Sequence, residues 1–141
     1  MENIISETAI KGGIAQAKVE QRALEKGFLV SKPIIEQSRY DLIIDNGDEL
    51  KRLQIKYCGK EQNSSKGSVC VDLRKQALNG KVTKGYKKSE VDAIVVYIPQ
   101  IDKVCYFPID MVDGKSTITI RYKRSANNQQ KRVIYADDYI W

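Results

Sequence analysis

The sequence has 141 residues, of which 42% are hydrophobic and 30% charged, and these values predict one soluble domain with a core of its own. The formal net charge of +6 at pH 7 favours a polyanionic partner, although lysine can also serve solubility alone. Histidine is absent, which excludes histidine-dependent triads and most transition-metal sites. Hydrolysis by this chain would therefore rest on carboxylates, lysine and a hard metal ion.

The sequence contains no apolar run near the roughly 20 residues that cross a bilayer. Its first residues lack the charge and apolar pattern of a signal peptide, so we expect a cytoplasmic protein with no membrane partner. The three cysteines, Cys58, Cys70 and Cys105, are widely spaced and form no Cys-x-x-Cys pair. Neither a disulfide framework nor a zinc site is indicated.

Residues 8–26 are predicted to form the first helix, because apolar residues recur at helical spacing and Gly27 ends the pattern. Gln16 and Glu20 lie one turn apart and share a side of this helix. If that side faces the hairpin that follows, both can approach a metal site; otherwise they form a solvated polar flank. Residues 28–35 are predicted to form a strand that, because it includes Pro33, either lies at the edge of a sheet or has a frayed end.

Residues 39–58 are predicted to form two strands joined through a tight turn at Asn46 and Gly47. Side chains of a strand point to opposite faces in alternation, so Gln54 and Lys56 share one face of the second strand. The other face carries the apolar or aromatic residues Leu53, Ile55 and Tyr57.

The position of Asp41 depends on the length of the hairpin loop. A loop of two or four residues places Asp41 on the face of Gln54 and Lys56, whereas a three-residue loop places it on the opposite face. A carboxylate and an amide oxygen are hard ligands suited to Mg²⁺, and a neighbouring ammonium can hold water and stabilise charge on a phosphate. The alternative is a polar face that is merely solvated.

The middle of the sequence is strongly basic. Residues 59–67 are predicted to form a polar loop, residues 68–73 a short strand, and residues 74–88 a basic loop. Loops of this kind become ordered against phosphate backbones, and Arg74 is one candidate for contact with a base or a phosphate. The candidate DNA-binding residues of this region, residues 59–90, are Lys60, Lys66, Arg74, Lys75, Lys81, Lys84, Lys87 and Lys88.

The last third of the sequence is rich in strands. Residues 91–98 are an apolar run typical of a central strand buried on both faces. A returning strand over residues 104–107, a helical turn over residues 109–112 and a strand over residues 117–122 follow. A first helix followed by mainly antiparallel strands predicts an α+β fold, with a mixed, mainly antiparallel sheet flanked by helices.

The order and spacing of several stretches resemble the PD-(D/E)xK nuclease superfamily, and within it the small intron-encoded homing endonucleases of cyanobacterial type. The resemblance covers nearly the whole chain. The matching stretches are residues 11–19, 39–45, 53–56, 91–97, 102–108, 127–129 and 136–139.

The resemblance implies a restriction-endonuclease-like core over a single domain, residues 1–141, in a bacterial-type protein. Asp41 takes the place of the metal-binding aspartate, Gln54 the place usually filled by Asp or Glu, and Lys56 that of the catalytic lysine. Gln16 stands where relatives carry glutamate, and Glu20, one turn on, is an alternative carboxylate. Whether Gln16 is natural or an inactivating change stays open.

The expected function is a Mg²⁺-dependent, site-specific endonuclease that hydrolyses phosphodiester bonds in double-stranded DNA. Asp41 and the carbonyl of Ile55 would hold the metal, and Lys56 would assist the water. Gln54 would either add its amide oxygen to the metal or orient that water. Cutting both strands requires two sites, so a homodimer or homotetramer is expected. The alternatives are a Holliday-junction resolvase or repair nuclease of the same fold, and a DNA-binding module with weakened catalysis, which the two glutamines favour.

Overall fold

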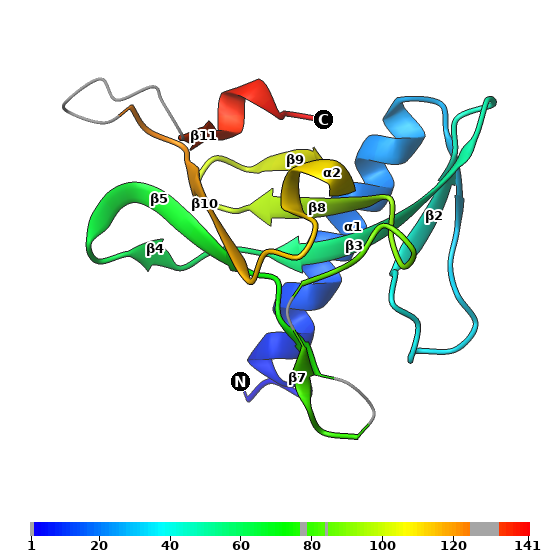
Figure 1. Cartoon of the computed structure of the whole chain (residues 1–141), viewed down its shortest axis with the longest axis horizontal. Coiled ribbons are helices and arrows are strands. Elements are labelled where there is room, and N and C mark those ends of the chain that lie inside the picture. Colours follow the sequence, from blue (N-terminus) through cyan, green and yellow to red (C-terminus); the bar gives the residue numbers. More distant parts are fainter. Residues whose placement is uncertain (1, 77–78, 84, 125–132) are drawn as a thin grey trace.

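The computed structural model describes residues 2–76, 79–83, 85–124 and 133–141, and Figure 1 shows how its elements are arranged. The first element is α1 (Glu7–Glu25). The hydroxyl of Ser6 caps it by accepting a hydrogen bond from the amide of Ala9 at 3.2 Å. The chain leaves the helix through Gly27, whose φ of 81° is the left-handed conformation that glycine adopts without strain. The predicted first helix is thus confirmed.

A five-stranded sheet forms the centre of the fold, with its strands in the order β1-β2-β3-β8-β9. Only β3 and β8 are parallel neighbours; the other pairs of this sheet are antiparallel. β1 is an edge strand, which is one of the two predicted possibilities, but it ends short of the proline. The bounds are β1 (Leu29–Ser31), β2 (Leu42–Asp45), β3 (Leu50–Tyr57), β8 (Ala93–Ile98) and β9 (Lys103–Pro108).

A second sheet has its strands in the order β11-β10-β5-β4. The prediction of a loop over residues 59–67 is wrong, because β4 and the start of β5 occupy that segment. The segment has no apolar side chain, so its strands form through backbone pairing that a hydrophobic pattern does not reveal. The bounds are β4 (Glu61–Gln62), β5 (Ser65–Asp72), β10 (Thr117–Arg121) and β11 (Ile134–Tyr135).

A small hairpin and two short helical elements complete the fold. β6 (Lys75–Gln76) and β7 (Val82–Thr83) form the hairpin, which projects from the body in Figure 1 and corrects the prediction of a loop over residues 74–88. α2 (Ile109–Val112) follows β9 as predicted, and η1 (Ala136–Asp138) is a single 3₁₀ turn. Among the described residues, no helix has the length and apolar character needed to cross a membrane.

The central sheet is covered on both faces. On one face, Ala15, Val19 and Ala23 of α1 pack against a cluster that includes Leu53 and Ile55 of β3. On the other face, Ile94 and Val96 of β8 form a second cluster with apolar residues of β5, β9 and β10. All six residues of β8 are buried, which confirms the predicted central strand. The predicted α+β fold with a mainly antiparallel sheet is likewise confirmed.

Candidate active site

The hairpin of β2 and β3 has a loop of four residues, residues 46–49, because Asp45 pairs with Leu50. The side chain of Asn46 accepts hydrogen bonds from the amides of Asp48 and Glu49, each at 3.0 Å. This local network fixes the turn predicted at Asn46 and Gly47. Four is one of the two lengths for which alternation predicts that Asp41 joins Gln54 and Lys56.

Asp41 lies immediately before β2 and is held against β3 by two hydrogen bonds. Its amide donates to the carbonyl of Leu53 and its Oδ2 accepts from the amide of Ile55, both at 2.8 Å. The carboxylate of Asp41 thereby satisfies the amide of Ile55, which has no partner in β2 because that strand begins only at Leu42. Burial raises the pKa of Asp41, while the Ile55 amide and the charge of Lys56 act in the opposite direction.

Gln54 and Lys56 lie on the face of the central sheet opposite α1. They pair in parallel register with Ile94 and Val96, which belong to the apolar cluster on that side. The ammonium of Lys56 lies 5.2 Å from the ring centre of Tyr86, which places it in a cation–π contact with the ring. Gln54 is half-buried, and its side chain makes no hydrogen bond to the part of the chain that the structure describes. Its amide oxygen is thus available to a ligand.

The donor set around Asp41 suits a hard divalent ion. One carboxylate oxygen of Asp41 is engaged by Ile55, and the second oxygen and the amide oxygen of Gln54 are donors of the kind that Mg²⁺ takes together with water. Within the described ranges, no group of three or more His, Cys, Asp or Glu side chains could hold a metal. A metal held here would therefore depend on neutral oxygens and water besides one carboxylate.

The helical pair Gln16 and Glu20 lies on α1, which packs on the face of β3 opposite Lys56. The amide of Gln16 donates to Oε1 of Glu20 at 3.2 Å, and the ammonium of Lys32 lies 2.6 Å from the same oxygen. Both side chains are half-buried. No hydrogen bond or ion pair among the described residues joins either of them to Asp41, so their approach to a metal stays a prediction.

A groove of about 330 Å³ extends from Lys56 along β5 and is lined by Lys60, Asp72 and Arg74. The guanidinium of Arg74 donates two hydrogen bonds to Asp72, each at 3.0 Å, and its amide a third at 2.9 Å. These bonds, with a contribution from Lys56, lower the pKa of Asp72 to about 2. Sequence reasoning missed Asp72, because it lies in the second sheet and nothing local in the sequence relates it to Lys56.

Sequence reasoning also missed Glu90, which is buried and forms ion pairs with Arg39 and Lys75. Burial alone would raise the pKa of Glu90, but hydrogen bonds from Lys75 and the Lys87 amide, together with the Arg39 charge, lower it. Glu90 stands among exposed polar residues, Lys87 to Ser89, so its surroundings in the sequence suggest a surface position.

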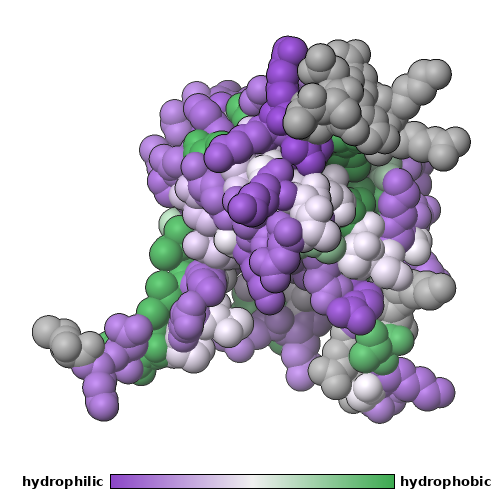
Figure 2. Space-filling model, turned by 90° about the vertical axis from the view of Figure 1, so that its left-hand side faces the viewer, coloured by the Kyte–Doolittle hydropathy of each residue, from purple (hydrophilic) through white to green (hydrophobic). Residues whose placement is uncertain are grey.

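The predicted DNA-binding residues have different surroundings. Lys75 is largely covered by its pairing with Glu90, and Arg74 is paired in the groove. Lys88 lies 3.5 Å from Asp110 at the surface, and Lys84 lies outside the described residues. The others are exposed; they are Lys60, Lys66, Lys81 and Lys87. Figure 2 shows that the side of the molecule on which β4 and β5 lie is largely hydrophilic.

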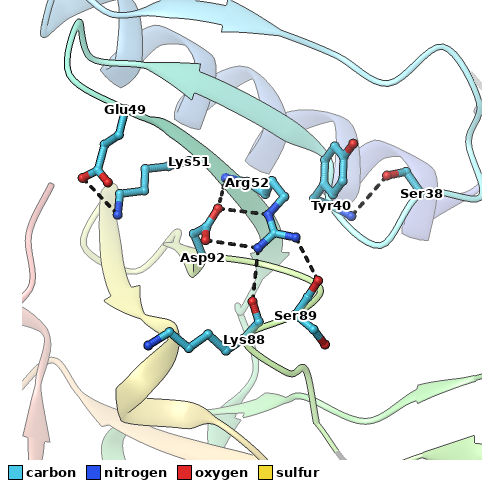
Figure 3. Close-up of polar contacts among 8 residues, drawn as sticks. All are labelled: Ser38, Tyr40, Glu49, Lys51, Arg52, Lys88, Ser89 and Asp92. Carbon is cyan, nitrogen blue, oxygen red and sulfur yellow. Dashed lines mark hydrogen bonds and ion pairs between the residues drawn. The ribbon is translucent and has the colours of Figure 1, made fainter.

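Arg52, two residues before Gln54, anchors the turn that follows the β6–β7 hairpin (Figure 3). Its guanidinium donates to both carboxylate oxygens of Asp92, at 3.0 and 3.2 Å. It also donates to the carbonyls of Ser89 and Lys88, at 2.9 and 3.1 Å. A single side chain of β3 thus fixes residues 88–92 beside the polar face of the strand.

The hairpin of β2 and β3 lies in a mixed five-stranded sheet that α1 covers on one face. The sequence matches the family described as PD-(D/E)XK endonuclease over residues 6–141, so the chain belongs to that family. The resemblance inferred from the sequence is thereby confirmed.

One solved structure agrees with this assignment, and two others show lower similarity. A bacterial homing endonuclease, I-Ssp6803I, is 27% identical with a TM-score of 0.75, covering 96% of this chain and 89% of its own. The Holliday junction resolvase Hjc of Archaeoglobus fulgidus is 13% identical with a TM-score of 0.48, covering 79% of this chain and 84% of its own. MepB is 15% identical with a TM-score of 0.43, covering 74% of each chain. A comparison with curated protein sequences found no match.

Proposed function

We propose that this nuclease is a Mg²⁺-dependent DNA endonuclease that hydrolyses phosphodiester bonds in double-stranded DNA at specific sites. The observation that carries the proposal is the carboxylate of Asp41, which the Ile55 amide fixes at 2.8 Å beside Gln54 and Lys56 on a single strand. Membership of the endonuclease family and the likeness to a homing endonuclease support it.

The metal would be held by Asp41, the amide oxygen of Gln54 and the main-chain carbonyl of Ile55, with water completing its shell. A bound Mg²⁺ supplies positive charge that polarises the phosphate. Asp41 contributes one oxygen while its other oxygen stays on the Ile55 amide, so the ligand is oriented before the metal arrives. Gln54 is neutral and contributes orientation rather than charge.

Lys56 acts on the phosphate and on the attacking water. Its ammonium stabilises negative charge that develops on the phosphate oxygens, and its N–H groups hold the water in line with the bond to be broken. The ring of Tyr86, 5.2 Å away, limits the positions that this flexible side chain explores.

The basic residues around the groove would hold the DNA backbone. Lys60 lines the groove beside Lys56, and Lys66, Lys81 and Lys87 are exposed. Binding through such residues releases counterions, so affinity should fall steeply with salt. Cleavage of both strands needs two sites of opposite orientation, for which a symmetric homodimer or homotetramer is the simplest assembly.

A DNA-binding module without cleavage is the second candidate. The observation that favours it is neutral glutamine at Gln16 and Gln54, where the superfamily resemblance implies carboxylates. A supercoiled plasmid distinguishes the two functions when it is incubated with the protein in Mg²⁺ and in EDTA. The endonuclease nicks and linearises the plasmid only with Mg²⁺, whereas the module shifts its mobility and leaves it intact at every Mg²⁺ concentration.

The same assay needs a charge-matched control. Lys51→Ala removes a lysine from the same strand but near the hairpin turn, where Lys51 pairs with Glu49 at 3.0 Å. Cleavage that persists in Lys51→Ala and is lost in Lys56→Ala supports the proposed site. Equal cleavage by both variants, or affinity that does not change with salt, contradicts the proposal.

A further inference from the structure

Among the residues described, Glu90 is the one acidic side chain that is buried, with 7% of its side chain exposed. A buried carboxylate is costly unless cations and hydrogen-bond donors surround it. Glu90 receives the guanidinium of Arg39, the ammonium of Lys75 and, at 3.4 Å, the amide of Lys87. These three donors come from three different segments of the chain, so Glu90 joins segments that no strand pairing connects.

Arg39, the first partner of Glu90, connects it to the segment that carries Asp41. Arg39 lies two residues before Asp41, in the segment between β1 and β2. The side chain of Arg39 is 64% exposed, so most of its surface stays open to solvent despite the contact with Glu90. The contact ties this segment to the turn before β8, while the Ile55 amide binds the carboxylate of Asp41. Asp41 is therefore fixed between two anchors.

Lys75, the second partner of Glu90, shares the ring of Tyr86 with Lys56. The ammonium of Lys75, at the base of the β6–β7 hairpin, lies 5.4 Å from the ring centre of Tyr86. The ammonium of Lys56 lies 5.2 Å from the same ring. Two like charges that share one ring repel each other, and the carboxylate of Glu90 offsets that repulsion by pairing with Lys75.

The turn that carries Glu90 is held by hydrogen bonds of its own main chain and of Arg52. The amide of Glu90 donates to the carbonyl of Lys87 at 2.9 Å, closing a turn. Arg52 clamps the carbonyls of Lys88 and Ser89, as Figure 3 shows. The turn that ends at Glu90 is thus held from β3, the strand that carries Gln54 and Lys56.

We propose that Glu90 is a positioning residue of the nuclease site, which holds Lys75 beside Lys56 on the Tyr86 ring and fixes the segment that presents Asp41. The inference rests on the proposed nuclease function. It assigns Glu90 no contact with the substrate or the metal, and it explains why a buried charge lies beside the site, where a hydrophobic side chain would give comparable stability.

The decisive variant is Glu90→Gln, which keeps the shape and an acceptor oxygen but removes the charge. Its matched control is Glu49→Gln, the same change in the exposed pair with Lys51. Because loss of an outer-shell partner typically lowers activity about 10- to 100-fold, Glu90→Gln should lower kcat by that factor. The KM for plasmid DNA should change less than about threefold, because the exposed lysines remain. Glu49→Gln should match the parental protein in both constants.

A second readout is independent of cleavage. The ring current of Tyr86 shifts the NMR signals of the ε-CH₂ groups of Lys56 and Lys75, and Glu90→Gln should move the Lys75 signals toward those of an exposed lysine. Unchanged Lys75 signals together with a kcat equal to that of Glu49→Gln would overturn the inference. If the parental chain does not cleave, the proposed function fails, and the NMR signals alone decide whether Glu90 positions Lys75.

A third variant covers the case in which Glu90→Gln does not fold. Arg39→Gln removes an exposed partner and leaves no core cavity, so it should fold, and it should also lower kcat. Where Glu90→Gln does fold, the double variant Arg39→Gln, Glu90→Gln adds a further test. Arg39→Gln should lower kcat no further in that background, because the two residues act through one contact. Full kcat in Arg39→Gln, or additive losses in the double variant, would contradict the proposed link between Glu90 and Asp41.

Discussion

The two faces of β3 have the same backbone but opposite surroundings. Leu53 and Ile55 are buried against α1, whereas Gln54 and Lys56 point to the other side and stay half-buried. The strand is held by pairing with β2 and β8, by the packed face and, on the polar face, by the contacts of Arg52, so Gln54 and Lys56 themselves contribute little to the fold. Changes at Gln54 and Lys56 should therefore affect chemistry, and changes on the packed face should affect stability.

The largest effect is expected from Lys56→Ala on the polar face. It should abolish plasmid cleavage, because no other side chain is assigned to the attacking water, and it should leave the unfolding midpoint nearly unchanged. Asp41→Asn should also stop cleavage, through weaker metal binding, and excess Mg²⁺ should restore part of the rate. Mg²⁺ should not rescue Lys56→Ala. Cleavage by Lys56→Ala at the parental rate would show that this face is not the active site.

On the packed face, Ile55→Ala should lower the free energy of unfolding. Truncation of a buried aliphatic side chain leaves a cavity and typically costs about 2 to 5 kcal/mol in the free energy of unfolding. Urea denaturation followed by circular dichroism measures this loss, and Leu29→Ala, at a position that is 71% exposed, is the control. Equal stability of the two variants would mean that α1 does not depend on this face of β3.

The packed face was readily predicted from the sequence, because burial leaves a periodic pattern. The first helix, the hairpin turn at Asn46 and Gly47, and the buried strand β8 were recognised in this way. Alternation, which is also a local property, placed Gln54 and Lys56 on one face, but the face of Asp41 stayed open until the structure showed a four-residue loop.

The rest of the site could not be predicted, because it depends on contacts between distant segments. Asp72 approaches Lys56 only because the second sheet packs over the first, and Glu90 is buried only because Arg39 and Lys75 converge on it. A charged residue in a polar stretch has the same local pattern whether it is solvated or paired. β4 and the start of β5 were missed for the same reason, because backbone pairing leaves no hydrophobic signal.

An intermediate effect is expected where a polar contact supports the frame rather than the chemistry. Asp92 accepts hydrogen bonds from the amide and guanidinium of Arg52, and its side chain is 27% exposed. Asp92→Asn should lower the free energy of unfolding by about 1 to 3 kcal/mol, the cost of weakening a charged hydrogen-bonded pair. Urea denaturation in low and high salt checks it. A loss below that caused by Asp72→Asn would contradict the framework role of Arg52.

The smallest effect is expected from the Asp72–Arg74 pair, whose side chains are 58% and 57% exposed. An exposed pair contributes less than about 1 kcal/mol, although its pKa shift is large, because water and salt screen it. The pKa of Asp72 is lowered from 3.8 to about 2 in the folded protein, so the unfolded chain binds the proton more readily. The contribution is therefore present above pH 3.8 and disappears as the pH falls toward 2. The stability difference between the parental protein and Asp72→Asn should be small and constant from pH 5 to 7 and should shrink on acidification. A difference that grows toward low pH would show that Asp72 is protonated in the folded groove, and that Lys56 and Arg74 do not hold it ionised.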